Sequence, residues 1–299
     1  MQRHFAFIIN PISGTRDKDL LRQKIEAFAK ANQFPYHIFP SAADGDYGVL
    51  KNSIAQEGIT DVVIAGGDGT INGVLGALRD TAVQFGLLPC GSGNGLAFTT
   101  GLSRSMDKAL QIIKAGKSAP TDAFLINNRF ACMLCGLGFD AAVAHAFAAD
   151  PNRGLKTYIK KSVQHFFTAK AYPFTLLFQN TILESEAFFI SIANSNQFGN
   201  NFTIAPKASL TDGLLDIVIV TKQNKLNLVW QTLKQVSGYN AVQQIDMMNK
   251  AAGVIYLQTD AVTIQNPSRA PMHLDGDPVD TAENINVQLL KGCFRLIYP

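Results

Sequence analysis

Short apolar blocks alternate with amphipathic patterns in the first 122 residues of the chain. Runs of β-branched and aromatic residues predict strands at residues 5–9, 36–39, 62–64 and 85–88. After each run, apolar residues recur every three or four positions, which predicts a helix. Strands that alternate with helices are typical of a parallel sheet covered by helices on both faces. We therefore predict an α/β domain over residues 1–122.

The pattern changes after about Asp122. Short apolar runs joined by turns now predict strands at residues 123–126, 129–134, 175–178, 187–193, 213–220, 253–258, 261–265 and 285–290. Clear helical periodicity remains only at residues 155–167 and 226–236. These features predict a second domain over residues 123–290, a mainly antiparallel β-sandwich. A last apolar run at residues 293–298 fits either domain, so residues 291–299 are a candidate completion of the first domain.

Glycine-rich loops follow three of the four predicted strands of the first domain. They are Asn10-Pro-Ile-Ser-Gly14, Gly66-Gly-Asp-Gly-Thr70 and Gly91-Ser-Gly-Asn94. Ligands of open α/β sheets bind outside the carboxyl ends of the strands, and N–H groups of such turns bind phosphate. The loops therefore indicate a nucleotide pocket, although each alone could be an ordinary tight turn. Asp68 is unusual there, because a carboxylate repels phosphate unless it handles Mg²⁺ or a proton.

The composition describes a folded protein and excludes several function classes. Of the 299 residues, 47% are hydrophobic and 16% are charged, and the net charge of +3 is too small to favour a nucleic-acid partner. No apolar run approaches the ~20 residues that cross a bilayer, and no signal-peptide pattern precedes the first strand. We therefore expect a cytoplasmic protein. Cys132 and Cys135 have CxxC spacing without a second pair, so we interpret them as core thiols rather than zinc or redox groups.

Five ordered segments resemble the diacylglycerol kinase and sphingosine kinase family, including its bacterial lipid kinases. They are the three glycine loops and the segments 136–141 and 194–216, where the third loop is taken to begin at Leu88. The resemblance covers almost the whole chain. It implies an α/β domain of the NAD kinase and phosphofructokinase type followed by a β-sandwich. It also implies an ATP-dependent kinase that transfers the γ-phosphate to a hydroxyl of a diacylglycerol- or sphingoid-type lipid.

The resemblance also assigns ligands for the cofactors ATP and Mg²⁺. The nucleotide site would consist of Asn10, Pro11, Ser13, Gly14, Ser41, Gly66, Gly67, Asp68, Gly69, Thr70, Asn72, Gly91, Ser92, Gly93 and Asn94. Asp68 would hold the catalytic Mg²⁺ directly or through water. A second, structural Mg²⁺ would be bound by Asp212 and by the carbonyl groups of Ser209 and Leu214. An Asp-Gly turn without a metal is the alternative for that segment.

The triplet Asp275-Gly276-Asp277 would supply the base that takes the proton from the lipid hydroxyl. The usual family form ends in Glu, so Asp277 is one methylene shorter, and either carboxylate could be the base. On reach alone, we expect Asp275 to contribute at least as much chemistry as Asp277. A plain hairpin turn is the structural alternative. We interpret His273, which lies beside this turn, as a packing residue.

The predicted helix at residues 155–167 is the candidate lipid-facing element. Its apolar stripe comprises Leu155, Tyr158, Ile159, Phe166 and Phe167, and basic residues in and around it are Arg153, Lys156, Lys160, Lys161 and Lys170. A basic amphipathic helix can rest on anionic headgroups, which would place the protein at the inner membrane surface with its lipid substrate. A surface helix whose apolar face lies in the core has the same pattern. The sequence is compatible with a homodimer.

Two rival functions remain. A nucleotide kinase acting on NAD would share the Gly-Gly-Asp-Gly loop, but the segment 194–216 favours a lipid acceptor. A non-catalytic lipid-binding module is the other alternative, because the change to Asp277 could reflect lost activity.

Overall fold

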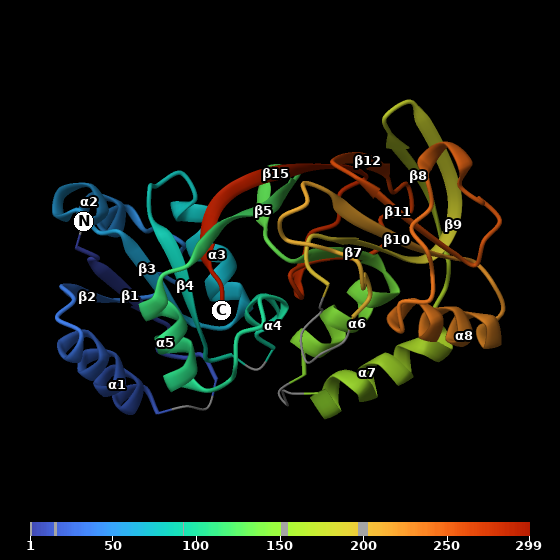
Figure 1. The fold of residues 1–299 in the computed structure, drawn as a ribbon. Helices are drawn as coiled ribbons and strands as arrows, with labels where there is room; N and C mark the ends of the chain where they lie inside the picture. Colours follow the sequence, from blue (N-terminus) through green and yellow to red (C-terminus); the bar gives the residue numbers. More distant parts are fainter. Residues whose placement is uncertain (1, 15–16, 92, 151–154, 197–202) are drawn as a thin grey trace. The chain divides into compact units, whose positions relative to one another are not determined.

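The computed structural model describes residues 2–14, 17–91, 93–150, 155–196 and 203–299. The chain divides into two compact units, shown in Figure 1. The first unit comprises Met1–Thr121 and Gly292–Pro299, and the second comprises Asp122–Lys291. Among the described residues, no helix combines the length and the apolar character that a membrane span requires.

A parallel sheet forms the centre of the first unit. Its strands are β1 (Phe5–Ile9), β2 (Tyr36–Pro40), β3 (Asp61–Gly66) and β4 (Gln84–Pro89), in the order β4-β3-β1-β2. The end of β15 (Asn284–Ile297) adds beside β4. Every residue of β1 and β3 is buried, as expected for strands of a parallel sheet covered on both faces. Ile9 pairs with Ala65 and Gly66 pairs with Pro89, so β1, β3 and β4 end together at one edge.

Helices connect these strands and bury their apolar faces on the sheet. They are α1 (Lys18–Ala31), α2 (Gly48–Glu57), α3 (Asp68–Leu78), α4 (Gly95–Thr99) and α5 (Met106–Ala115). Leu21 and Ile25 of α1 join Ile113 of α5 in one core cluster with Phe5 and Phe7 of β1. The cluster explains why the apolar residues of α1 recur at helical spacing.

The second unit is built from mainly antiparallel strands around one apolar core. The strands are the second part of β5 (Ser118–Ile126), β6 (Arg129–Ala131), β7 (Leu134–Gly138), β8 (Tyr172–Phe178), β9 (Thr181–Ala193), β10 (Leu215–Thr221), β11 (Val254–Thr259), β12 (Ala261–Gln265), β13 (Met272–Leu274), β14 (Asp277–Val279) and the first part of β15. Antiparallel pairs link β8, β7 and β10 to β9, and β12 to β15. The predicted fold class, an α/β sheet followed by an antiparallel sandwich-like unit, is confirmed.

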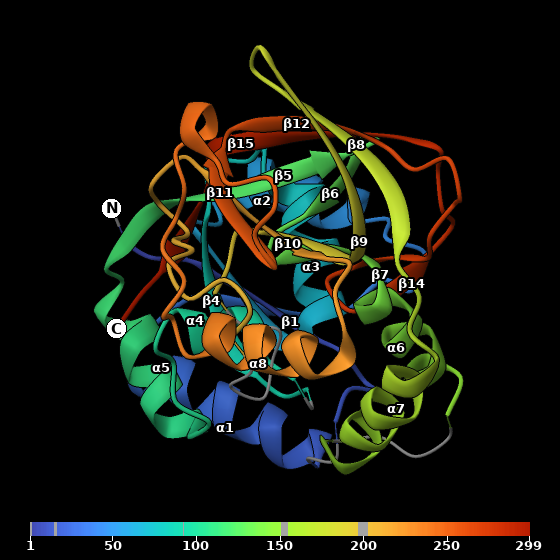
Figure 2. The ribbon, with the colours of Figure 1, turned by 90° about the vertical axis from the view of Figure 1, so that its right-hand side faces the viewer.

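Three helices of the second unit lie on one side of its strands (Figure 2). They are α6 (Phe139–Ala148), α7 (Leu155–Thr168) and α8 (Lys225–Val236). The predicted helices at 155–167 and 226–236 correspond closely to α7 and α8. Helix α6 was not predicted, because its apolar residues surround the helix and leave no amphipathic period to detect.

Two strand predictions need correction. The run 129–134 is not one strand but two, β6 and β7, which are separated at Cys132 and Met133. The runs 285–290 and 293–298 belong to a single strand, β15, whose first part pairs with β12 and whose end pairs with β4. Periodicity predicts where a chain is extended but not where a side chain from elsewhere interrupts it.

Candidate active site

The three glycine loops of the first unit meet at the carboxyl edge of the sheet, as predicted. A Cβ atom on Gly91 would lie 2.5 Å from the Cα of Gly67, so these two loops touch through their backbones. A Cβ atom on Gly14, whose φ is +61°, would overlap the carbonyl oxygen of Cys90. Close backbone approach therefore requires glycine at both positions, and at Gly14 the positive φ requires it as well.

The first loop is joined to the start of α3 by a side-chain hydrogen bond. Asn10 donates from Nδ2 to Oγ1 of Thr70 at 2.7 Å, and its backbone N–H donates to the carbonyl of Ala65 at 3.0 Å. Its Oδ1 accepts from the backbone N–H of Ile12 at 2.9 Å, which shapes the turn. Two predicted nucleotide residues, Asn10 and Thr70, are thus in direct contact although 60 residues separate them.

Asp68 is the first residue of α3 and points across the loops. A Cβ atom on Gly93 would lie 2.7 Å from its Oδ2 atom, so the carboxylate lies against the loop after β4. The helix N-terminus directs N–H groups and a partial positive charge to the same place. Asp68 therefore combines an anion-binding helix end with an oxygen donor suited to Mg²⁺.

The loop after β4 is shaped by Asn94. This residue is 4% exposed and has φ of +55°. Its Oδ1 accepts from the N–H of Gly91 at 2.8 Å, and its Nδ2 donates to the carbonyl of Gly91 at 2.7 Å. These bonds support the predicted pocket-shaping role of Asn94. Ser92 lies outside the described residues, and Ser41 follows β2 with its N–H bonded to the carbonyl of Ile9.

Asp275, which we expect to do at least as much chemistry as Asp277, is held in the fold by backbone hydrogen bonds. Its carboxylate accepts from the backbone N–H groups of Cys132 and Met133 at 3.1 Å each and from Leu134 at 2.8 Å. These bonds occur where β6 ends and β7 begins. They engage the oxygen lone pairs that a general base would need. Asp277, by contrast, is exposed at the start of β14.

A second carboxylate, which the sequence did not predict, supports the hairpin of β13 and β14 that carries the triplet. Asp140 of α6 is 8% exposed, and its Oδ2 lies 3.5 Å from Nε2 of the buried His273. The N–H of Gly276 reaches Nδ1 of His273 at 3.3 Å. A Cβ atom on Gly136 would overlap both Asp140 and His273. Gly136 therefore leaves room for this pair, and sequence spacing alone could not connect Asp140 to His273.

The loop at residues 209–214 contains Asp212 and lies near the carboxylates of Asp122 and Asp216. The N–H of Gly213 donates to Asp122 at 2.8 Å, and the N–H of Leu214 donates to Asp212 at 3.1 Å. Burial and the nearby Asp122 carboxylate raise the pKa of Asp212. Burial also raises the pKa of Asp216 to about 6, although Tyr256 and Gln258 donate hydrogen bonds to it. Neighbouring acids of this kind are the donors that Mg²⁺ or Ca²⁺ prefers.

Much of the predicted lipid-facing stripe lies outside the described residues. Arg153 lies outside the described residues, as do the side chains of Leu155, Lys156, Tyr158, Ile159 and Phe167. Of the rest, Lys160 and Lys170 are exposed, and Lys161 forms an ion pair with Asp150 at 3.0 Å.

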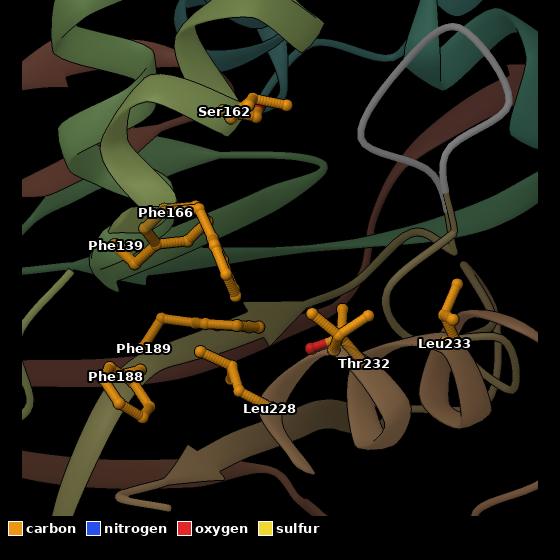
Figure 3. A pocket seen from close by; sticks show the side chains of 10 residues that line it. Phe139, Ser162, Phe166, Phe188, Phe189, Leu228, Thr232 and Leu233 are labelled. Carbon is orange, nitrogen blue, oxygen red and sulfur yellow. The ribbon is translucent and has the colours of Figure 1, made fainter. Parts of the chain in front are cut away.

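An apolar cavity of about 480 Å³ lies between α7, α8 and β9 (Figure 3). It is lined by Phe139, Ser162, Val163, Phe166, Phe188, Phe189, Leu228, Val229, Thr232 and Leu233. Phe166, Phe189 and Leu228 point toward one another inside it. Lys225 joins the ends of the two helices, since its Nζ donates to the carbonyls of Phe166 and Ala169 at 2.9 Å each. These two hydrogen bonds link the end of α7 to the start of α8 beside the cavity.

Comparisons with known proteins agree with this architecture. Residues 4–126 match the diacylglycerol kinase catalytic domain, and residues 134–297 match the YegS C-terminal NAD kinase beta sandwich-like domain. A "Probable lipid kinase YegS-like" of Chromohalobacter salexigens is 26% identical over 282 residues, which cover 92% of this chain and 88% of that protein. A protein of the same name from Enterobacter sp. strain 638 is 27% identical over 289 residues, covering 94% and 92%.

A solved structure described as a diacylglycerol kinase of Bacillus anthracis shares the fold. It covers 99% of this chain and 97% of its own, with a TM-score of 0.75 at 18% identity. The two domain matches together extend from residue 4 to residue 297. The chain therefore belongs to the lipid kinase family in which a diacylglycerol kinase catalytic domain is followed by a YegS-type NAD kinase-like β-sandwich.

Proposed function

We propose that this protein transfers the γ-phosphate of ATP to a hydroxyl group of a diacylglycerol- or sphingoid-type lipid. The observation that carries the proposal is the cradle formed by three glycine loops around Asp68 at the start of α3. Its close backbone approaches leave N–H groups rather than side chains to contact phosphate. Phosphoryl transfer mainly needs positioning and charge stabilisation, and such a cradle can supply both.

In this proposal, the cradle would hold the phosphates and Asp68 would hold Mg²⁺, which would neutralise negative charge on the transferring phosphoryl group. Asn10, Ser13, Gly67, Gly69 and Thr70 contribute backbone or side-chain contacts to the phosphates. Thr70 is already oriented by its bond from Asn10. The acids around the loop 209–214 would bind a second, structural cation through Asp212 and the carbonyls of Ser209 and Leu214.

Asp277 takes the proton from the lipid hydroxyl, while Asp275 holds the turn that carries it. The exposure of Asp277 and the three backbone contacts of Asp275 support this division. A positioned carboxylate base typically contributes ~10²–10⁴-fold to the rate.

The apolar cavity between α7 and α8 would hold an acyl or sphingoid chain. Its volume of about 480 Å³ lies within the ~300–1,000 Å³ range of small-molecule pockets. Its rim residues are unusually exposed for apolar side chains, since Val163 is 53% and Leu233 is 56% exposed. A lipid chain that entered there would cover surface that now contacts water.

Helix α8, rather than α7, is the element that we infer to contact the membrane. Leu226 is 86%, Trp230 is 60% and Leu233 is 56% exposed, and their spacing of four and three residues places them on one face. Trp is typical of the membrane–water interface because its ring is apolar and its N–H is polar.

Charge on the two helices favours an anionic bilayer as the partner of this face. The sequences of α7 and α8 contain lysines but neither Asp nor Glu. Lys234 lies beside Trp230, with Nζ 5.9 Å from the ring centroid. Each basic residue near a charged surface contributes roughly 1 kcal/mol to binding. Docking through α8 would also present the rim of the cavity to the lipid.

The activity is tested by incubating the purified protein with radiolabelled ATP, Mg²⁺ and vesicles that contain one candidate acceptor each. Diacylglycerol, a sphingoid base, ceramide and phosphatidylglycerol form the lipid series, and NAD is the soluble acceptor. Label transferred to one lipid class supports the proposal. Label transferred to NAD alone would instead make this a nucleotide kinase. Vesicle binding without transfer or hydrolysis of ATP would leave the non-catalytic module.

Membrane docking is tested by co-sedimentation with vesicles of phosphatidylcholine with and without phosphatidylserine. The double substitution Leu226→Ser with Trp230→Ser should weaken binding at least about tenfold, because two apolar anchors are removed. Val49→Ser is the matched control, since Val49 is a 75% exposed apolar residue of α2 in the other unit. Unchanged binding by the double variant would refute the role of α8.

A further inference from the structure

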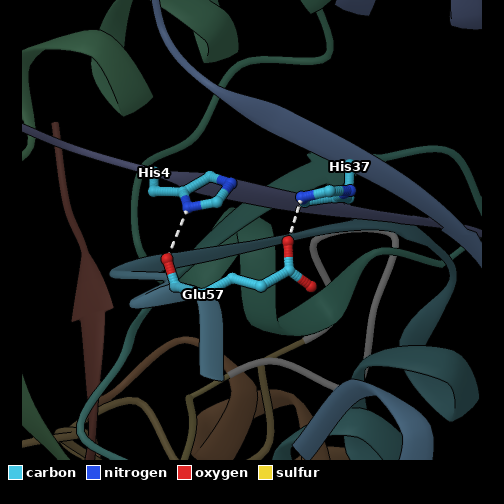
Figure 4. Close-up of side chains that lie close together, drawn as sticks. All are labelled: His4, His37 and Glu57. Atoms are coloured by element: carbon cyan, nitrogen blue, oxygen red, sulfur yellow. Dashed lines mark hydrogen bonds and ion pairs between the residues drawn. The ribbon is translucent and has the colours of Figure 1, made fainter. Parts of the chain in front are cut away.

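Two histidines and a glutamate of the first unit converge where β1 and β2 begin (Figure 4). His4 directly precedes β1, His37 is the second residue of β2, and Glu57 is the last residue of α2. The parallel register pairs Ala6 with His37, so His4 and His37 project from the same face of the sheet. We propose that these three residues form a binding site for a transition-metal cation of the Zn²⁺ class.

The donor atom of His4 is set by its hydrogen bond. Nδ1 of His4 lies 3.0 Å from the backbone carbonyl oxygen of Glu57. A carbonyl can only accept, so Nδ1 carries the proton and Nε2 of the neutral ring keeps its lone pair. Metal-binding histidines in proteins usually have this arrangement, in which a carbonyl or carboxylate fixes the tautomer and the ring orientation. Nε2 of His4 is thus prepared to bind a cation.

The remaining donors are close enough to share one ion. Nε2 of His37 lies 2.6 Å from Oε2 of Glu57, and one donor atom from each of the three residues lies within 4.8 Å of the others. Ligand atoms around a tetrahedral zinc lie roughly 3.3 Å apart, given bonds of ~2.0–2.1 Å. Binding would therefore open the His37–Glu57 pair and draw His4 inward by small side-chain movements. Among the described residues, no other three His, Cys, Asp or Glu donors converge in this way.

The donor set discriminates between cations. Two imidazole nitrogens and one carboxylate are borderline donors that suit Zn²⁺, Co²⁺ or Ni²⁺, whereas Mg²⁺ requires oxygen ligands and keeps its waters. The Mg²⁺ that a kinase needs would therefore not compete for this site. The side chains of His37 and Glu57 are 42% and 38% exposed, so a cation can reach them from solvent.

The site lies at the opposite end of β1 from the glycine loop that begins at Asn10. A cation there would not touch the nucleotide cradle. It would instead tie the end of α2 to the starts of β1 and β2, and so stabilise the first unit without taking part in phosphate transfer. The role we propose is structural or regulatory, because stability of this unit would depend on the supply of the cation.

The test uses the untagged full-length protein, freed of metal by a chelator and kept in excess Mg²⁺. Titration with Zn²⁺ should show one bound equivalent, and Zn²⁺ should raise the melting temperature by a few degrees. Co²⁺ should give the visible absorption of a low-coordinate site. His4→Ala, His37→Ala and Glu57→Gln should each weaken Zn²⁺ binding at least about tenfold, since even loss of a supporting bond costs that much.

His165→Ala and Cys293→Ser are the controls, because they remove a histidine and a partly exposed thiol elsewhere and should leave binding unchanged. Loss of Zn²⁺ binding in the control variants, or equal binding by the wild type and all three site variants, would overturn the proposal.

Discussion

Substituting the two acids of the triplet one at a time should separate structure from chemistry. In Asp275→Asn, the amide oxygen can still accept from the N–H groups of Met133 and Leu134. The amide NH₂ then faces the N–H of Cys132, so that bond is lost and two donors oppose each other, while the two remaining bonds lose their charge assistance. A hydrogen bond to a charged group contributes about 1.5–3 kcal/mol, so we expect a loss of roughly 2–4 kcal/mol in the free energy of unfolding.

Backbone strain should add little to that loss. Asp275 has φ of +48°, a conformation that Asn adopts about as readily as Asp. The expected change is a large share of the ~5–15 kcal/mol by which a typical domain is stable. Urea unfolding followed by circular dichroism measures this change in the free energy of unfolding. The turnover of the protein that remains folded should fall less than the loss of stability would suggest.

Asp277→Asn is the matched partner of this experiment. Because Asp277 is exposed, its substitution should change the free energy of unfolding by less than about 0.5 kcal/mol. Turnover with lipid should nevertheless fall ~10²-fold or more, since the base is lost. Asp277→Glu restores the usual family residue and should keep turnover within about tenfold of wild type.

The opposite pattern would refute the assignment. If Asp275→Asn were as stable as wild type but inactive, and Asp277→Asn retained normal turnover, Asp275 would be the base despite its three backbone contacts.

Three further predictions address the cradle and the second unit. Asp68→Asn should lower turnover at least about 10²-fold while thermal melting is unchanged, and a variant that keeps more than a tenth of the activity would contradict a metal role. Gly91→Ala should weaken ATP binding measured by calorimetry, because its Cβ would lie 2.5 Å from Gly67 and push two loops apart, whereas Gly73→Ala, with open space around its Cβ, should not. Burial raises the pKa of Asp216 from 3.8 to about 6, so the folded state keeps its proton between pH 4 and 6 while the unfolded state releases it. The free energy of unfolding of wild type relative to Asp216→Asn should therefore fall by up to about 3 kcal/mol as the pH rises through this window. Urea titrations at several pH values measure this difference in free energy, and a difference that stays constant or rises with pH would refute the prediction.

The nucleotide half of this protein could be predicted from local patterns. Buried parallel strands produce continuous apolar runs, and backbone approach to phosphate demands glycine, so both features are visible within a few residues of sequence. Strands β1, β3 and β4, and the meeting of their loops, follow from these patterns and from the common direction of parallel strands. What the pattern does not contain is which loop atoms touch, such as Gly93 against Asp68.

Only tertiary structure decided the surroundings of the acids and the exposure of the amphipathic helices. The N–H donors that engage Asp275 lie 141 to 143 residues away, so no spacing rule connects them to it. Helices α7 and α8 both carry apolar stripes with lysines, and a stripe has the same period whether it packs into a core or contacts a membrane. Packing leaves Leu226 and Trp230 of α8 in solvent, and the convergence of His4, His37 and Glu57 likewise arises only when distant segments fold together. The sequence determines which segments are helices and strands because those preferences are local, whereas burial and contact between distant side chains exist only in the folded chain.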